Sequence, residues 1–307
     1  MGISTREAYG KALVELGKKY DFFVMDADLS KATQTIQFKK VFPHRFFNMG
    51  VSEGDMMTTA AGMASCGKIV FASSFAMFAA GRAYEQIRNS IAYPDLHVIV
   101  GGTHAGVLIG EDGASHQCIE DISLMRTIPN MTVLVPCDEK SVFATVETAI
   151  TSNGPVYIRM GRGAAEDVYT NPPEVKIGNG IVLRDGSDAT LIAIGDLVPE
   201  ALKAAELMSQ NGISAAVIDM ISVKPLDEEL VRYYAKKTGK IITAEDHNII
   251  GGLGSAVSEV VAELGYAQIR RVGIHDKFGR SGGRSALQTH FRLNAQEILD
   301  TYKLFYK

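Results

Sequence analysis

The chain has 307 residues, a length that suits two domains better than one compact core. Its formal net charge is −4, and acidic and basic residues are mixed along it without a Lys/Arg run, which argues against binding to nucleic acid or to a membrane surface. Three widely spaced cysteines fit neither a disulfide framework nor a zinc spacing, and neither a signal peptide nor a bilayer-spanning apolar run is evident, so we expect a cytoplasmic protein.

The first half of the chain alternates between short apolar runs and longer segments with helical patterning. A capping-box pattern, Ser4-Thr5-Arg6-Glu7, predicts a first helix that runs to about Lys19. Strands are expected near 22–25, 46–49, 68–71, 97–101, 132–135 and 155–159. Helices are expected near 53–66, 75–93, 119–127 and 138–151. This alternation predicts a parallel sheet covered by helices on both faces.

A change of composition follows, because the stretch from Gly161 to Glu174 is rich in Gly, Pro and polar residues and is typical of an exposed linker. A second series then predicts strands near 189–194, 214–219, 240–244 and 268–272, and helices near 198–211, 227–237, 252–265 and 294–303. We therefore predict two three-layer α/β domains, at residues 1–162 and 179–307, joined by a linker at 163–178.

The segment 101–117 is the most informative part of the chain. It holds five glycines, His104, His116 and the adjacent acids Glu111 and Asp112, and it follows the apolar run 97–100. Open α/β sheets place ligands in loops of this kind, at the ends of buried strands. The spacing of His104, Asp112 and His116 does not suit zinc. It suits acid/base work and recognition of the hydroxyl groups of a polyol. The alternatives are a solvated turn and structural histidines.

Glu53 stands where a short strand ends and a helix begins. Its carboxylate is either a charge favoured by the helix dipole or a functional acid. The helix that follows is apolar nearly all round, which indicates burial. A partly desolvated carboxylate at this place suits proton exchange with a base on a ligand.

Two aromatic residues and two arginines complete the candidates. Phe75 and Phe78 have helical spacing, which is typical of a core, but small residues surround them and leave room for a flat ring to stack. Arg6 and Arg159 are candidate ligands for an anion. Arg159 follows an apolar strand, at the end where substrates bind, although either arginine could also be an ordinary surface residue.

Taken together, these motifs resemble transketolase, a thiamine-diphosphate-dependent enzyme, over essentially the whole chain. The specific part is the loop with Thr103-His104, Gly110-Glu111-Asp112-Gly113 and His116-Gln117. Further similar motifs are Met25–Leu29, Gly50–Glu53, Phe75–Gly81, Ile194-Gly195, Val223–Asp227, Glu245–His247 and Gly251–Gly254.

The resemblance implies a role for each candidate. Glu53 matches the glutamate that contacts the aminopyrimidine ring of thiamine diphosphate, and Phe75 matches the aromatic that stacks on that ring. Phe78 lies at a nearby aromatic position, and Asp28 matches an acid in the cofactor-binding and interface region.

The resemblance also assigns residues to the substrate. His116 matches a histidine near the reacting oxygens of the donor, and Asp112 matches a residue that reads a substrate hydroxyl. His104, Arg6 and Arg159 match positions that hold the sugar phosphate. Among these, His104 and His116 join Glu53 as expected catalytic residues.

One part of the family pattern is missing. Full-length transketolases carry Gly-Asp-Gly followed by Asn, which hold Mg²⁺ and the diphosphate, and this chain has no such motif. It therefore looks like the C-terminal subunit of a split transketolase, with no metal ligands of its own. A separate N-terminal, diphosphate-binding subunit would complete an α2β2 heterotetramer in which this chain pairs with itself.

The expected activity is transfer of a two-carbon ketol unit from a ketose phosphate to an aldose phosphate, in pentose-phosphate carbohydrate metabolism. Lys31-Ala32 replaces a family serine near the substrate phosphate, which leaves the acceptor open. Alternatives are a 1-deoxy-D-xylulose-5-phosphate synthase-like or 2-oxo-acid dehydrogenase beta-like subunit and, outside enzymes, a non-catalytic paralogue that binds a partner. A Rossmann dehydrogenase is disfavoured, because no Gly-x-Gly-x-x-Gly follows the first strand.

Overall fold

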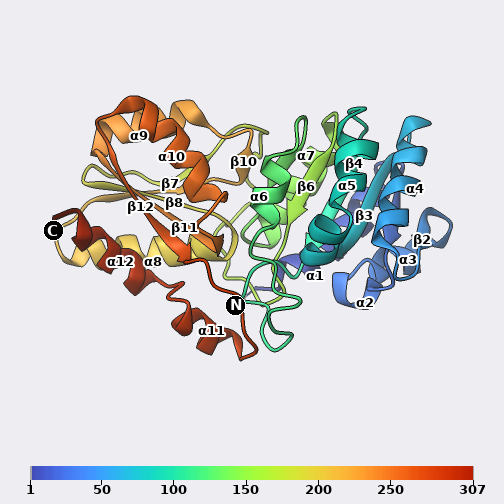
Figure 1. The fold of residues 1–307 in the computed structure, drawn as a ribbon, viewed down its shortest axis with the longest axis horizontal. Helices are drawn as coiled ribbons and strands as arrows, with labels where there is room; N and C mark the ends of the chain where they lie inside the picture. The colour runs from blue at the N-terminus through green and yellow to red at the C-terminus, as the bar shows by residue number, and fades with distance from the viewer. Residues whose placement is uncertain (1, 307) are drawn as a thin grey trace.

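The computed structural model describes residues 2–306 as two lobes that lie side by side (Figure 1). The N-terminal lobe is built on a seven-stranded sheet with the order β10-β5-β6-β4-β3-β1-β2. The C-terminal lobe is built on a five-stranded sheet with the order β12-β11-β8-β9-β7. Neighbouring strands are parallel except in the pairs β10–β5 and β7–β9. The predicted class, two mostly parallel sheets covered by helices, is confirmed.

The elements have the following bounds. The N-terminal half contains α1 (Thr5–Gly17), β1 (Phe22–Asp26), α2 (Ser30–Thr33), α3 (Ile36–Val41), η1 (Pro43–Arg45), β2 (Phe46–Asn48), α4 (Glu53–Ser65), β3 (Ile69–Phe75), η2 (Met77–Arg82), α5 (Tyr84–Gln86), η3 (Ile87–Ala92), β4 (Val98–Thr103), α6 (Asp121–Arg126), β5 (Thr132–Leu134), α7 (Glu139–Thr151) and β6 (Val156–Arg159). The C-terminal half contains β7 (Ile181–Arg184), β8 (Ala189–Ala193), η4 (Gly195–Leu197), α8 (Val198–Gln210), β9 (Ala215–Asp219), β10 (Ser222–Lys224), α9 (Glu228–Thr238), β11 (Lys240–Asn248), α10 (Leu253–Leu264), β12 (Gln268–Ile274), α11 (Arg284–His290), α12 (Ala295–Lys303) and η5 (Leu304–Tyr306).

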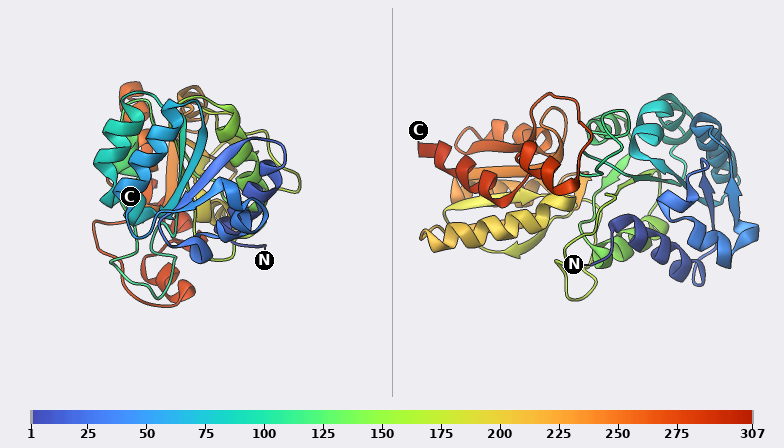
Figure 2. Two further views of the ribbon diagram at one scale, coloured as in Figure 1. Left: turned by 90° about the vertical axis from the view of Figure 1, so that its right-hand side faces the viewer. Right: turned by 90° about the horizontal axis from the view of Figure 1, so that it is seen from below.

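Helices cover both faces of each sheet (Figures 1 and 2). In the N-terminal lobe α1 and α7 pack together on one face, and α4 packs with η3 on the other. In the C-terminal lobe α9 pairs with α10 and α8 pairs with α12. The main apolar core runs from one lobe into the other, since it joins Met131 and Val133 to Ile218, Met220 and Leu253. This continuity fixes the lobes against each other through buried apolar area. None of the helices within residues 2–306 is both long and apolar enough to cross a membrane.

Several features differ from the expected elements. The helix expected at 75–93 is instead the end of β3 followed by the π-helical segments η2 and η3 around the short α5. The wider turn of a π-helix changes which side chains share a face, and such turns are frequent at functional sites. The strand β10, from the second half of the chain, adds to the first sheet by pairing antiparallel with β5. The sequence pattern also does not predict the short helices α2 and α3, the strand β7 or the helix α11.

Candidate functional site

Two adjacent parallel strands bring four aromatic side chains together. β3 and β4 are in register such that Phe75 lies beside Thr103, and both strands end there. The ring of Phe75 stacks on His104 at a centroid distance of 3.8 Å and on Phe78 at 5.9 Å. His116 meets Phe78 edge-on at 5.3 Å. Phe75, Phe78, His104 and His116 form what we call the aromatic cluster, at the carboxyl edge of the first sheet, where α/β proteins bind ligands.

Glu53 reaches this edge from the first turn of α4. Its side chain is buried, with 2% exposed, and its Oε2 lies 3.2 Å from Nη1 of Arg82. Arg82 ends η2, and its guanidinium lies over the ring of Phe78 at 5.2 Å from the centroid. Arg82 therefore connects the carboxylate of Glu53 to the aromatic cluster. Arg82 was not selected from the sequence, where the only signal for it was its position four residues after Phe78.

His104 occupies an unusual backbone conformation, with a φ of +56°, directly after β4. The side chain is buried, and its Nδ1 lies 3.0 Å from Oγ1 of Thr103. Burial, together with the positive charges of Arg6 and Arg162, lowers the pKa of His104 to about 3. The imidazole is consequently neutral at physiological pH, so it exchanges hydrogen bonds with a ligand rather than acting as a cation.

The low pKa of His104 predicts a loss of stability in acid. The unfolded chain binds a proton at this imidazole below its ordinary pKa of about 6.5, while the folded protein does not bind it until about pH 3. The contribution of the neutral imidazole to the free energy of unfolding is therefore complete above pH 6.5. It is lost as the pH falls, by about 2 kcal/mol between pH 7.5 and 5.

His104→Asn is the matched variant for this test, because Asn tolerates a positive φ. Urea unfolding at the two pH values should show a fall in stability that is about 2 kcal/mol smaller in the variant than in the wild type. An equal fall in both proteins would contradict the prediction.

Two arginines lie together beside the loop. Arg162 donates from Nη1 to the carbonyl of Ile109 at 2.6 Å and to Oε2 of Glu111 at 3.3 Å, and the same nitrogen lies 3.8 Å from Oδ2 of Asp112. Arg6 donates to the carbonyls of Arg162 at 3.3 Å and of Ala32 at 2.7 Å. Burial and the neighbouring charge of Arg162 lower the pKa of Arg6. Arg162, three residues after Arg159, was not selected from the sequence.

Asp28 lies at the same edge, just beyond β1. Its backbone has a φ of +65°, and its exposed carboxylate accepts a hydrogen bond of 2.8 Å from Nδ2 of Asn48. The edge therefore collects Asp28, Glu53 and the aromatic cluster, with Arg6, Asp112 and Arg162 beside the loop.

Arg159 does not join this group. Its Nε donates to Oδ2 of Asp121 at 2.8 Å, and its Nη2 donates to the carbonyl of Asp246 at 2.8 Å. Burial opposes its charge, but the carboxylates of Asp121 and Asp246 together outweigh that effect and raise the pKa of Arg159. Tyr157 also donates to Asp121. In this structure Arg159 belongs to a buried ion pair rather than to a surface that awaits an anion.

The site has features that suit a flat heterocycle with a basic nitrogen. Arg82 links the buried carboxylate of Glu53 to the ring of Phe78, and the rings of Phe75 and Phe78 are stacked with 17° between their planes. Glu53 offers an acceptor, and the rings offer apolar faces. These groups fit the aminopyrimidine of thiamine diphosphate. Within residues 2–306 no group of three or more His, Cys, Asp or Glu side chains is placed to hold a metal ion.

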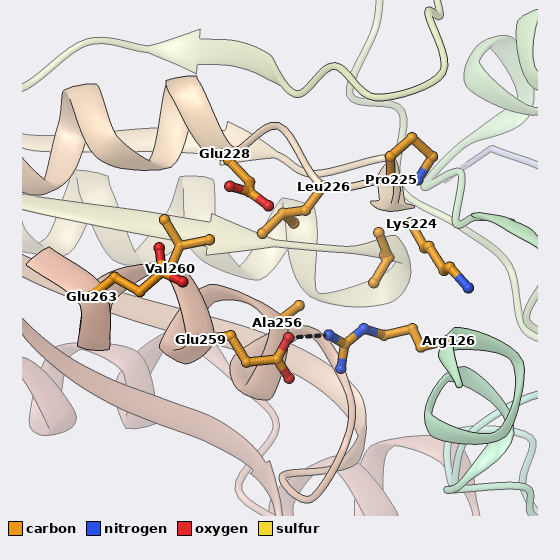
Figure 3. A pocket seen from close by; sticks show the side chains of 10 residues that line it. Arg126, Lys224, Pro225, Leu226, Glu228, Ala256, Glu259, Val260 and Glu263 are labelled. Atoms are coloured by element: carbon orange, nitrogen blue, oxygen red, sulfur yellow. Dashed lines mark hydrogen bonds and ion pairs between the residues drawn. The ribbon is translucent and has the colours of Figure 1, made fainter. Parts of the chain in front are cut away.

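A cavity of about 460 Å³ lies elsewhere, where α6 meets β10 and α10 (Figure 3). Its two cations, Arg126 and Lys224, make contacts between the lobes. Arg126 donates to the carbonyl of Gly251 at 2.7 Å and to Glu259 at 2.9 Å, and Lys224 donates to the carbonyl of Ile128. The residues that the sequence predicts for a site lie at the carboxyl edge of the first sheet and do not line this cavity, so we place the candidate site at the aromatic cluster.

Comparisons with known proteins agree with this fold. Residues 1–167 match the family described as "Transketolase, pyrimidine binding domain", and residues 178–298 match "Transketolase, C-terminal domain". A putative transketolase C-terminal section from Methanocaldococcus jannaschii is 52% identical over 95% of this chain and 93% of its own length. A 6-deoxy-6-sulfo-D-fructose transketolase subunit from a Clostridium strain is 41% identical over 96% of this chain and 92% of its own length.

A solved structure described as "Split gene transketolase, inactive beta4 tetramer" has a TM-score of 0.92 at 50% identity and covers 98% of both chains. By contrast, a 1-deoxy-D-xylulose-5-phosphate synthase from Desulforudis audaxviator is 35% identical, and the match spans only 48% of its length. The chain thus belongs to the transketolase family and has the domain content of the C-terminal section of a split transketolase.

Proposed function

We propose that this chain is the C-terminal subunit of a split transketolase that transfers a two-carbon ketol unit from a ketose phosphate to an aldose phosphate. The observation that carries the proposal is the convergence of Glu53, the aromatic cluster and the Arg6–Arg162 pair at one edge of the first sheet. Thiamine diphosphate would supply the nucleophilic carbon that accepts and passes on the two-carbon unit.

Each candidate residue of the site has a role in that chemistry. Glu53 holds a proton at the aminopyrimidine, and Phe75 and Phe78 stack against that ring, with Asp28 at the rim. Arg82 pairs with Glu53 and thereby helps to hold the carboxylate in place at the start of α4.

The substrate side uses the loop. His104 is neutral and gives a hydrogen bond to the sugar phosphate, while Arg6 and Arg162 supply the positive charge. Asp112 accepts a hydrogen bond from a hydroxyl group of the substrate, and His116 moves a proton at the reacting oxygens of the donor. Arg162 thereby takes the role that the sequence suggested for Arg159.

The proposal includes a separate partner. The similar structure described above is an inactive tetramer of beta chains from a split-gene transketolase, which supports a requirement for an N-terminal subunit here. We propose that this partner carries the Mg²⁺ and diphosphate ligands, that the two chains form an α2β2 assembly in the cytoplasm, and that the substrates are pentose-phosphate sugars.

The test is reconstitution. Ketol transfer is measured with thiamine diphosphate and Mg²⁺, first with this chain alone and then with the candidate N-terminal protein. Activity in the mixture only is the expected result. Inactivity with all ketose phosphates, together with turnover of pyruvate, would instead assign the chain to the synthase or the 2-oxo-acid class, and no catalysis in any mixture would favour a non-catalytic partner-binding protein.

Arg162→Ala should raise KM for phosphorylated sugars about 10- to 100-fold in the reconstituted enzyme, because a charge-assisted hydrogen bond to phosphate is lost. The effect on kcat should be small, since the phosphate is remote from the reacting carbon. Steady-state kinetics with a phosphorylated donor and with its unphosphorylated counterpart make the comparison.

The exposed Arg88, whose side chain donates to its neighbour Asn89, provides the control variant Arg88→Ala. An unchanged KM for the phosphorylated donor in Arg162→Ala would remove Arg162 from the phosphate site. An equal rise in KM for the unphosphorylated sugar would show that the variant had disturbed the loop instead.

A further inference from the structure

The loop that carries the proposed substrate residues is held by a side chain of the other lobe. Asp246 lies in β11 of the C-terminal sheet and is buried. Its Oδ1 accepts a hydrogen bond of 2.9 Å from the backbone N–H of Val107, and its Oδ2 accepts one of 3.0 Å from the N–H of Leu108. Both carboxylate oxygens are thus committed to two successive amides of the loop 103–117.

The loop approaches this carboxylate closely because it has a glycine at the right place. Gly106 has a φ of +78°, and a Cβ at this position would lie 2.1 Å from Oδ2 of Asp246. Only glycine permits both the backbone conformation and the contact. The residue two positions earlier is His104, whose own positive φ is a conformation that the surroundings must sustain.

The N-terminal lobe in turn fixes Asp246. Its backbone carbonyl accepts from Nη2 of Arg159, and the Nε of Arg159 is paired with Asp121. The buried Asp121–Arg159 pair therefore sets the position of β11 relative to the loop. In this arrangement Arg159 affects the site by holding Asp246, and not by binding an anion.

Other hydrogen bonds hold the same loop, some within it and some to the segment before α11 in the C-terminal lobe. Gln117 donates from Nε2 to the carbonyls of Gly110 at 3.2 Å and Arg280 at 2.9 Å, and Ser281 donates to the carbonyl of Glu111 at 2.7 Å. Figures 1 and 2 show the loop and the segment before α11 side by side beneath the two lobes. Asp246 differs from these contacts because it is a buried charge, and hydrogen bonds to a charge are the stronger ones.

We propose that Asp246 is a positioning residue for the ketol transfer proposed above: its carboxylate fixes the amides of Val107 and Leu108 and thereby the geometry of His104, Asp112 and His116. The inference rests on the proposed function for its catalytic consequence. A small displacement of positioned groups lowers the rate by about 100-fold in well-ordered sites, so the position of the loop governs kcat.

Asp246→Asn tests the proposal, because the amide has nearly the same shape but only one acceptor oxygen and turns an N–H toward a backbone N–H. The matched control is Glu245→Gln, next in the same strand. Glu245 is equally buried and also accepts from two backbone amides, of Leu253 at 2.7 Å and Gly254 at 2.8 Å, but these begin α10 and not the loop.

The first readout needs neither cofactor nor partner. Hydrogen exchange of the peptide 103–117 in the isolated chain should be about 10-fold faster in Asp246→Asn than in the wild type, as expected for one lost hydrogen bond to a charge. In Glu245→Gln the same peptide should exchange at the wild-type rate. Equal exchange of this peptide in the two variants would overturn the proposal.

The second readout is the reconstituted enzyme. Asp246→Asn should lower kcat about 10- to 100-fold and change KM for the sugars less than threefold, whereas Glu245→Gln should retain kcat. A mere loss of stability would affect both variants alike and would not separate kcat from KM. If the wild-type mixture is itself inactive, the proposed function fails, and the exchange result still decides whether Asp246 holds the loop.

A second variant disturbs the contact between Asp246 and the loop by changing the loop. In Gly106→Ala the added methyl group would displace the carboxylate of Asp246, so the same gain in exchange and loss of kcat are expected even if Asp246→Asn fails to fold. Wild-type exchange and wild-type kcat in folded Gly106→Ala would overturn the proposal.

Discussion

Glu53→Gln is expected to lower kcat for ketol transfer by about 100- to 10,000-fold in the reconstituted enzyme, the range by which a positioned proton-transfer group contributes. The reason is that the carboxylate is buried at the first turn of α4, where glutamine fills the same space but cannot take up and release a proton. KM for the sugars should change little, because the proposed sugar contacts come from the loop and from Arg6 and Arg162.

Two controls isolate the carboxylate. Asp55→Asn removes a neighbouring acid from the same helical turn, but Asp55 is exposed, so this variant should keep its kcat. Arg82→Gln removes the ion pair with Glu53 while leaving the carboxylate in place. Circular dichroism and thermal melting confirm that each variant is folded. A kcat above a tenth of the wild-type value in Glu53→Gln would remove this residue from the chemistry.

Much of the fold follows from local patterns. Apolar runs of four to six residues alternate with longer helical segments, and the resulting order predicts parallel sheets. The same reasoning places Glu53 at the start of a helix and His104 just after a strand, as the structure has them. Strand ends of a parallel sheet share one edge, so the meeting of Phe75 with His104 is a consequence of topology.

The features that the sequence did not indicate depend on contacts between distant residues. The strand β10 has only three residues, and its pairing with β5 arises across the two lobes. The π-helical turns have no distinct composition, so η2 and with it the contact of Arg82 to Glu53 could not be anticipated. Asp246 reaches the loop over 138 positions of sequence.

The two arginines at and after the end of β6 show most clearly what the sequence does not predict. Arg159 and Arg162 both follow the apolar run that forms this strand, and either could bind an anion by position alone. What separates them is Asp121, whose buried carboxylate pairs with Arg159 and leaves Arg162 beside Arg6 and Asp112. No local pattern identifies a partner that is 38 residues away.

Arg159→Met should destabilise the protein by about 3–5 kcal/mol, the cost of breaking a buried ion pair by removing one partner. Methionine keeps much of the side-chain volume, so the cost of a cavity stays small. The carboxylate of Asp121 would remain fully buried with the hydroxyl of Tyr157 as its donor, at 2.8 Å, and Asp246 would lose the donor to its carbonyl. Urea unfolding monitored by circular dichroism measures the difference.

The double variant Arg159→Met/Asp121→Asn shows whether an uncompensated charge is the cause. Asparagine is neutral and still accepts from Tyr157, so we expect the double variant to recover about half of the lost stability. Arg232→Met, which removes an arginine paired with the exposed carboxylates of Glu228 and Glu263, should cost about 1 kcal/mol or less and serves as the control.

The stability measurement also decides between the two interpretations of Arg159. A residue that only held the sugar phosphate would raise KM when replaced and would leave the folded state as stable as before. Replacing a residue of the buried pair lowers the stability of the folded state and affects turnover through Asp246 and the loop. A large rise in KM for phosphorylated sugars with a loss of less than about 1 kcal/mol would return Arg159 to the phosphate site, because a loss that small is typical of an exposed ion pair.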